Sequence, residues 1–168
     1  GGRDGATATI HLLFGKKDAR INEYILQSLA PQRDALAAVY KALKDIEMKE
    51  GNCFSISNAD IATRANAYIP KGVAKVDDKG ISTGIGVFRD LGFLSTEGRS
   101  VARTIEMLPV AGKLDLTMST RYSEGLDEIE SFDSFREWVL LADSIDLLER
   151  FNKPILPNAQ ALNVTVVQ

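Results

Sequence analysis

The sequence predicts an α+β fold: a winged helix-turn-helix core, an N-terminal strand-helix unit and a C-terminal helical extension. The main observation is the segment 81–108, where an amphipathic helix ends at a glycine and a two-stranded hairpin follows at once. Residues 31–65 supply two further apolar helical stripes with a short strand between them. Three helices followed by a terminal hairpin are the element order of a winged helix, a shape that contacts nucleic acid or another protein.

Composition places the chain among ordinary globular proteins. It has 168 residues, of which 45% are hydrophobic and 26% charged, which is enough to bury a core. Cys53 is the single cysteine, so an intramolecular disulfide is excluded, as is usual for a reducing cytosol. The sequence contains neither a signal peptide nor an apolar run of the roughly 20 residues that a membrane span needs. The chain begins Gly-Gly without a methionine, which indicates a fragment of a longer protein.

Three parts follow one another along the chain. Residues 1–30 are the strand-helix unit, residues 31–112 the winged-helix domain, and residues 113–168 a helical extension packed on it. In the first part we expect a strand over residues 7–13. The helix after it has apolar residues at helical spacing: Ile21, Tyr24, Ile25 and Leu29.

The winged-helix domain begins with a helix that ends at Gly51. Its apolar stripe is Leu36, Val39, Tyr40, Leu43 and Ile46. A short strand carries Phe54 and Ile56, and Ser57 is then expected to cap a second helix together with Asp60. That helix turns Ile61 and Ala65 inward. Residues 66–80 form a loop rich in Lys, Asp and Gly, which is long for the turn of a helix-turn-helix.

The third helix occupies the position of a recognition helix. Ser82 is expected as its N-cap and Gly92 as its end, and its inward side is Ile81, Ile85, Phe88 and Leu91. The hairpin after it is predicted to start at Phe93, turn over residues 97–100 and return over residues 101–107. The positions expected to be exposed on the helix are Thr83, Gly84, Gly86, Arg89 and Asp90. These are poor readers of base edges, which call for Arg, Asn, Gln or Lys. Gly84 and Gly86 instead favour close packing or the close approach of a partner.

The C-terminal extension begins with a strand that carries Leu114 and Leu116. A long acidic helix of about six turns follows. Its apolar residues are Tyr122, Leu126, Ile129, Phe132, Phe135 and Val139. Ser144 is expected to cap a short helix that carries Ile145, Leu148 and Phe151 and stops at residues 152–154. Residues 162–167 are β-prone and predict an edge strand.

Charge is divided unevenly along the chain, whose net charge is −3. Residues 71–113 carry seven basic and five acidic side chains, whereas residues 123–149 carry nine acidic and one basic. Because an acidic segment repels a phosphate backbone, DNA contact is expected on the first of these segments. The candidate DNA-binding residues are Lys71, Lys75, Lys79, Arg89, Arg99 and Arg103. Non-specific phosphate contact, or simply a solvated face, fits them better than base reading.

Other chemically suggestive residues have blander interpretations. His11, the single histidine, lies on the expected first strand, where a structural or surface role is expected. Cys53 precedes Phe54 at a strand start and is expected to be buried as a small hydrophobic side chain. Glycines 80, 84 and 86 are not followed by the Gly-Lys-Ser/Thr of a phosphate loop. Trp138, Phe132 and Phe135 are expected in the helix core, because a base-stacking surface favours basic neighbours and theirs are acidic.

Four stretches resemble one family of nucleases. They read HLLFGKKDARIN, VFRDLGFLSTEG, KLDLTMSTRYSEGLDEIESF and RFNKPILP, at residues 11–22, 87–98, 113–132 and 150–157. In this order they are similar to the C-terminal region of RecJ-type single-stranded-DNA exonucleases of bacteria, in versions that carry an extra domain after the catalytic core. The resemblance covers residues 8–157, and its last two stretches are the most specific.

The resemblance implies a parent enzyme that degrades single-stranded DNA from the 5′ end in DNA repair and recombination. That enzyme uses Mn²⁺ or Mg²⁺ held by the aspartates and histidines of DHH motifs. Those motifs are absent here, so no catalytic residue carries over, and the metal is expected only in the missing core. The expected role is to guide single-stranded DNA or to dock a repair partner such as single-strand-binding protein, in the bacterial cytoplasm and away from membranes.

Two alternatives remain open from the sequence. The chain could be a winged-helix transcription regulator, although its third helix is a weak reader and the acidic block is superfluous for that role. It could also be a winged helix that binds proteins, as in chromosome-segregation or replication machinery, with the acidic helix packed on a partner.

Overall fold

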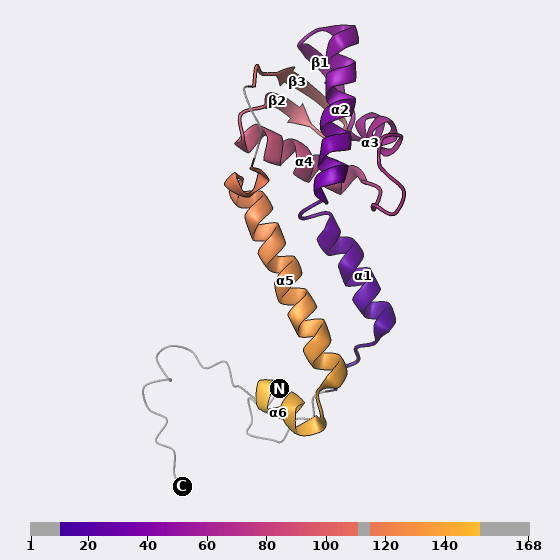
Figure 1. Cartoon of the computed structure of the whole chain (residues 1–168), viewed down its shortest axis with the longest axis vertical. Helices are drawn as coiled ribbons and strands as arrows, with labels where there is room; N and C mark the ends of the chain where they lie inside the picture. The colour runs from indigo at the N-terminus through magenta and orange to yellow at the C-terminus, as the bar shows by residue number, and fades with distance from the viewer. Residues whose placement is uncertain (1–10, 111–114, 152–168) are drawn as a thin grey trace, which may run out of the picture.

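The computed structural model describes residues 11–110 and 115–151 and shows an α+β protein. In this part of the chain, a small sheet and three helices form a head, and two long helices project from it as a stalk (Figure 1). The head comprises α2 (Arg33–Glu50), β1 (Cys53–Ile56), α3 (Asn58–Asn66), α4 (Asp78–Asp90), β2 (Leu94–Arg99) and β3 (Ala102–Met107). The stalk comprises α1 (Lys16–Gln27) and α5 (Thr120–Leu141). Within the described ranges, no helix is long and apolar enough to cross a membrane.

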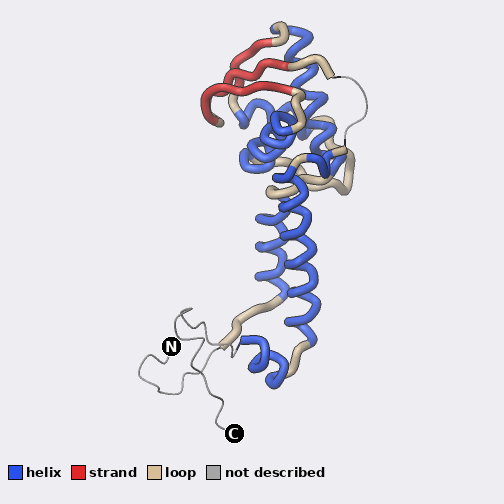
Figure 2. The backbone as a smooth tube through the Cα atoms, turned by 90° about the vertical axis from the view of Figure 1, so that its left-hand side faces the viewer, coloured by secondary structure: helices blue, strands red, loops and turns tan. Residues whose placement is uncertain are grey.

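The sheet has three antiparallel strands in the order β1-β3-β2. Ile105 of β3 stands between Phe54 of β1 and Thr96 of β2. Phe54 and Ile105 are buried against the helices, as the alternation of apolar and polar residues predicts for a sheet with one covered face. The strands lie together on one side of the head, and the helices cover that single face (Figure 2).

The core of the head is formed by the apolar stripes that the sequence predicts. Leu36, Val39, Leu43 and Ile46 of α2 are buried, and so are Ile61 and Ala65 of α3 and Ile81, Ile85 and Phe88 of α4. Tyr40 packs edge-on against Phe93 with ring centroids 5.4 Å apart. Burial of large aliphatic side chains of this kind contributes roughly 1.5–3 kcal/mol each. The predicted inward sides of the three helices are therefore confirmed.

Two helix boundaries of the head also follow the sequence. Gly51 ends α2 with a φ of 94°, a conformation that disfavours any side chain. The Ser57 hydroxyl accepts a hydrogen bond from the Asp60 amide at 3.1 Å, so Ser57 is the N-cap of α3.

The start of α4 differs from the prediction. The helix begins at Asp78, and the Asp77 carboxylate caps it by accepting from the Gly80 amide at 2.7 Å. Ser82 is therefore not the N-cap. It lies inside the helix, where its hydroxyl accepts from the Asn58 side chain at 2.7 Å. Both side chains can cap a helix. Asp77 is the N-cap because the loop is anchored immediately before it, where the Asn66 side chain binds the backbone of Val76.

The hairpin turn is also shorter than predicted. Pairing continues to Arg99 and Ala102, so the turn is Ser100-Val101 and residues 97–99 belong to β2. The prediction placed Gly98 in the turn because glycine is common in turns. In the structure Gly98 lies in β2, where the absence of a side chain allows the Ala102 backbone to approach closely. Its φ is 82°, and a Cβ there would lie 2.6 Å from the Ala102 carbonyl oxygen.

The stalk is a pair of antiparallel helices that lie side by side in both views (Figures 1 and 2). Arg136 of α5 forms an ion pair with Glu23 of α1 and a second with Asp133 at 3.2 Å. Near the head, α5 crosses close to the chain that joins α1 to α2. The crossing needs Gly125, because a Cβ there would lie 2.8 Å from the Leu29 carbonyl oxygen. The 22 residues of α5 confirm a helix of about six turns.

At the far end of the stalk, α6 (Ser144–Phe151) folds back beside α5. The Arg150 guanidinium lies 4.3 Å from the ring centroid of Trp138. Asp143 caps α6, since its carboxylate accepts from the amides of residues 145 and 146 at 2.8 and 2.9 Å. The prediction that Ser144 caps this helix is therefore wrong. An aspartate one position earlier competes better for the same amides.

The apolar residues that predict the helix α1 do not mark the side of it that meets α5. Ile21, Tyr24 and Ile25 are 61%, 63% and 45% exposed, whereas Ala19 is buried and Leu26 lies beside Phe132 of α5. The helix has two apolar sides, and α5 covers only one of them. Periodicity within α1 cannot identify that side, because the covering residues lie about a hundred positions later in the sequence.

The strand expected around Leu114 and Leu116 is not formed in the described residues. Leu116 lies in a short 3-10 helix, η1 (Leu116–Met118), and Leu114 lies outside the described part. Residues 11–13, the described end of the expected first strand, are not in a strand. Residues 7–10, the expected stop at 152–154 and the β-prone tail at 162–167 also lie outside the described part.

Candidate nucleic-acid interface

The six predicted DNA-binding residues lie on three segments of the head. Two lie on the loop between α3 and α4, two on α4 itself and two on the β2-β3 hairpin. In that order they are Lys71 and Lys75, Lys79 and Arg89, and Arg99 and Arg103. All are exposed except Arg103, which is half-buried.

The loop that carries the two lysines is anchored at its end. The Asn66 side chain donates to the Val76 carbonyl and accepts from the Val76 amide, both at 2.9 Å. Val76 is itself buried in the core. Because the far end of the loop is fixed in this way, Lys71 and Lys75 extend into solvent from a held backbone. Within residues 11–110 and 115–151, neither lysine forms a salt bridge.

Arg103 of β3 lies close enough to α4 for charged residues of that helix to shift the pKa of its guanidinium. Partial burial lowers the pKa of its guanidinium, the nearby charge of Asp78 raises this pKa, and the charge of Arg89 lowers it. The β3 strand therefore brings Arg103 into the field of two residues at opposite ends of α4. A cation that is partly desolvated in this way interacts more strongly with an incoming phosphate than an exposed one.

Arg89 is the least available of the six residues. Its guanidinium lies 3.7 Å from the Asp90 carboxylate, which also forms an ion pair with Arg121 at 3.5 Å and accepts a hydrogen bond from the Ser119 hydroxyl at 3.2 Å. Lys79, Arg99 and Arg103 form no salt bridge in the described part of the chain. Acidic residues lie among the basic ones, so the surface is mixed: Asp77, Asp78, Glu97 and Glu106.

One side of α4 is covered by the start of α5. Gly86 is buried, and a Cβ there would lie 2.8 Å from Nε of Arg121. Gly84 is buried as well, and a Cβ added there would lie 3.0 Å from the Leu36 side chain. The prediction that these glycines are exposed is wrong, although their predicted role in close packing holds. Arg121 was not singled out from the sequence, which carries no local signal for this contact.

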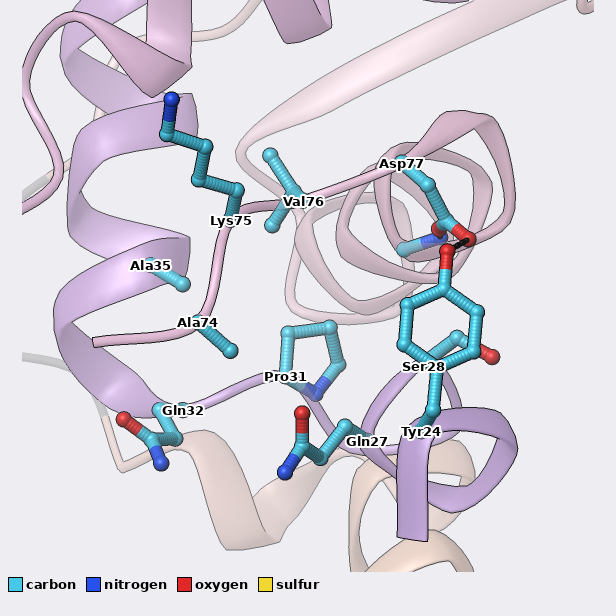
Figure 3. Close-up of a pocket in the computed structure, with 11 residues that line it drawn as sticks. Tyr24, Gln27, Ser28, Pro31, Gln32, Ala35, Ala74, Lys75, Val76 and Asp77 are labelled. Atoms are coloured by element: carbon cyan, nitrogen blue, oxygen red, sulfur yellow. Dashed lines mark hydrogen bonds between the residues drawn. The ribbon is translucent and has the colours of Figure 1, made fainter. Parts of the chain in front are cut away.

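A cavity of about 270 Å³ lies where the stalk joins the head (Figure 3). Its apolar lining is Pro31, Ala35, Ala74 and Val76, and its polar lining includes Gln27, Gln32 and Lys75. In Figure 3 the Tyr24 hydroxyl points to Asp77, while the Lys75 side chain extends away along α2. We call this the junction cavity. The sequence gives no sign of it, because its walls come from three separate segments.

The other chemically suggestive residues are not assembled into a site. Cys53 is exposed at the start of β1, so the prediction that it is buried is wrong: an edge position exposes its side chain while Phe54 turns inward. His11 is exposed as well. Within the described residues, no group of three or more His, Cys, Asp or Glu side chains is placed to hold a metal ion.

Comparison of the chain with protein-family models, with characterised proteins and with solved structures finds no significant match. The function of the chain is therefore inferred from the geometry of the head and from its side chains.

Proposed function

We propose that this chain is the non-catalytic C-terminal module of a RecJ-type 5′–3′ single-stranded-DNA exonuclease. In this proposal, residues 31–112 form a winged helix-turn-helix. The element order α2-β1-α3-α4-β2-β3 and the strand order β1-β3-β2 support it. The four sequence stretches that resemble the family support the choice of parent enzyme. Mn²⁺ or Mg²⁺ would belong to the catalytic core of that parent and not to this chain.

The observation that carries a DNA-guiding role is the contrast between α4 and the segments around it. The Gly86 side of α4 is covered by Arg121, so the helix offers little surface for reading base edges in a duplex. Lys71, Lys75 and Arg99 instead extend from the loop and hairpin as exposed cations. Contacts of this kind bind the phosphate backbone without regard to sequence.

The test is binding of labelled single-stranded and duplex oligonucleotides, followed by fluorescence anisotropy at roughly 50 and 200 mM salt. We expect single strands to bind with an affinity that falls steeply as salt increases. Replacing five side chains with glutamine should remove most of that affinity: Lys71, Lys75, Lys79, Arg99 and Arg103. An unchanged affinity and an unchanged salt slope in this variant would rule out the DNA-guiding role.

A second candidate is a winged helix that docks a protein such as single-strand-binding protein. The observation that favours it is the exposed apolar surface of the stalk, at Ile21 and Ile25. Absence of binding to either form of DNA would favour this candidate within the same parent enzyme. Preferential binding to one duplex sequence would favour a transcription regulator and contradict both.

A further inference from the structure

Among the described residues, the stalk leaves two apolar surfaces uncovered, one at each of its ends. The first is the α1 stripe, which we define as Ile21, Tyr24 and Ile25, together with the junction cavity next to Tyr24. The second is the outer side of α6 with the last residue of α5: Leu141, Ile145 and Leu148. Ile145 and Leu148 are 66% and 64% exposed. Clusters of exposed large apolar side chains of this kind mark interaction surfaces.

The shape of the first surface suits a side chain better than a cofactor. A volume of about 270 Å³ is below the roughly 300–1,000 Å³ of typical small-molecule sites. The cavity has apolar walls and opens beside the α1 stripe, so an apolar residue of a second helix would fit into it. Helices bind grooves in this way, with anchors spaced three or four residues apart. Ile145 and Leu148 have that spacing.

The charges around the two surfaces are opposite. Lys17 and Arg20 precede Ile21 on α1, and Lys75 lines the cavity at the other end of the stripe. Asp18 and Asp77 lie at the same surface, but each carboxylate accepts a hydrogen bond from a backbone amide, that of Gly15 or of Gly80. The second surface is bordered by acidic residues: Asp143, Asp146 and Glu149. Its nearest cation, Arg150, is placed over Trp138. The outer side of α6 therefore has both the apolar anchors and the charge that the α1 stripe requires.

We propose that two copies of this chain pair through their stalks, with α6 of each copy seated on the α1 stripe and junction cavity of the other. The stripe lies near the head, and α6 lies at the far end of the stalk (Figure 1). Two stalks placed side by side in opposite directions bring each stripe next to the partner's α6. The same contact then forms twice about a two-fold axis, which closes the assembly as a dimer. This inference does not depend on DNA binding or on the identity of the parent enzyme.

The test uses the full 168-residue chain without DNA, and analytical ultracentrifugation over a range of concentrations. We expect a dimer in the wild-type chain. Ile25→Asp and Leu148→Asp should each raise the dissociation constant at least about tenfold, since each places a charge in both copies of the contact. Met48→Asp is the matched control. Met48 is 84% exposed at the far end of α2 and should leave dimerisation unchanged.

Mixing the two variants tests the proposed pairing directly. In a mixed dimer, the intact stripe of the Leu148→Asp copy meets the intact α6 of the Ile25→Asp copy. One of the two contacts is thereby restored, so the mixture should dimerise more tightly than either variant alone. Circular dichroism of both variants is the control for folding, and spectra like that of the wild-type chain are expected.

Three outcomes would overturn the proposal. The first is a chain that stays monomeric at every concentration. The second is a dimer that tolerates both substitutions. The third is a dimer weakened by one substitution alone and not recovered by mixing, which would assign the surfaces to a different protein or to another segment of the chain.

Discussion

The Tyr24 hydroxyl of the stalk donates a hydrogen bond at 3.2 Å to the carboxylate of Asp77, the N-cap of α4. At the other end of α4, Asp90 accepts a hydrogen bond from Ser119, the N-cap of α5, and forms an ion pair with Arg121 of α5. The two stalk helices thus hold α4 at both of its ends. The orientation of the stalk and the orientation of the helix at the centre of the head are therefore fixed together.

Removal of the Tyr24 hydroxyl should change how stability depends on alkaline pH. The hydrogen bond to Asp77, followed by the charge of Asp77, raises the pKa of Tyr24 above its usual value near 10. A raised pKa means that the stabilisation is complete below about pH 10 and is lost as the pH rises through the folded-state value. We expect Tyr24→Phe to be less stable than wild type at neutral pH, with a difference that disappears at alkaline pH. Urea unfolding of both proteins at neutral and at alkaline pH measures their free energies of unfolding. The same difference between the two proteins at both pH values would contradict the expectation.

Substitution of Gly125 should weaken the attachment of the stalk. An alanine Cβ would lie 2.8 Å from the Leu29 carbonyl oxygen and 3.0 Å from the Cβ of Ala30, and neither of these neighbours is a flexible side chain. We expect Gly125→Ala to be destabilised by about 1–3 kcal/mol, as in overpacked cores. The control is Gly80→Ala, where the nearest atoms lie at 3.4 Å or more. That variant should be neutral or slightly more stable in urea unfolding, because alanine favours helix. Equal effects at the two positions would contradict the close approach.

Loss of the Asn58 side chain should loosen the connection between α3 and α4. Asn58 is fully buried, and its amide donates to the Ser82 hydroxyl at 2.7 Å and to the Asp78 carbonyl at 3.2 Å. We expect Asn58→Ala to lose about 1–3 kcal/mol, because these groups are left without their partner. Asn22→Ala is the matched control: it removes an amide that also donates to a carbonyl, that of Asp18, at an exposed site. A similar loss in both variants, measured by urea unfolding, would show that burial of Asn58 is unimportant.

The α3-α4 loop and the first turn of α4 should account for part of the salt dependence if the chain binds single strands. Each phosphate contact contributes about 0.7 to the slope of log affinity against log salt concentration. Replacing Lys71, Lys75 and Lys79 with glutamine should therefore reduce that slope by about 2. The charge-matched control replaces Lys16, Lys41 and Lys49, which lie on α1 and α2. Anisotropy titrations at several salt concentrations measure both slopes, and an equal reduction in the two variants would assign the effect to net charge alone.

The sequence predicts the head better than the stalk, for a physical reason. The inward sides of α2 and α4 follow from local periodicity, because each of these helices is buried along one continuous stripe. On α1 the same reasoning selects Ile21 and Ile25, which are exposed. For a helix with two apolar sides, only the position of the partner helix, here α5, decides which side is buried.

The candidate site could also be predicted from the sequence only where its residues depend on local structure. The positions of Lys71 and Arg99 on a loop and a hairpin follow from turn residues and strand alternation in the sequence. The contact between Gly86 and Arg121 could not be predicted, because it joins separate helices through one side chain. The same is true of the cap of α4. Both Asp77 and Ser82 have side chains that suit a cap, and Asp77 is the N-cap because the loop is anchored just before it, where Asn66 binds Val76.

The separation of Glu23 and Arg136 along the chain determines when the two stalk helices can pair during synthesis. These residues are 113 positions apart in the chain. At about 5–20 residues per second, α1 leaves the ribosome roughly 6–23 s before its partner helix is available. The head lies between the two helices in the sequence and is complete by then. We therefore expect the nascent chain to fold its head first, with α1 unpaired until α5 has been synthesised.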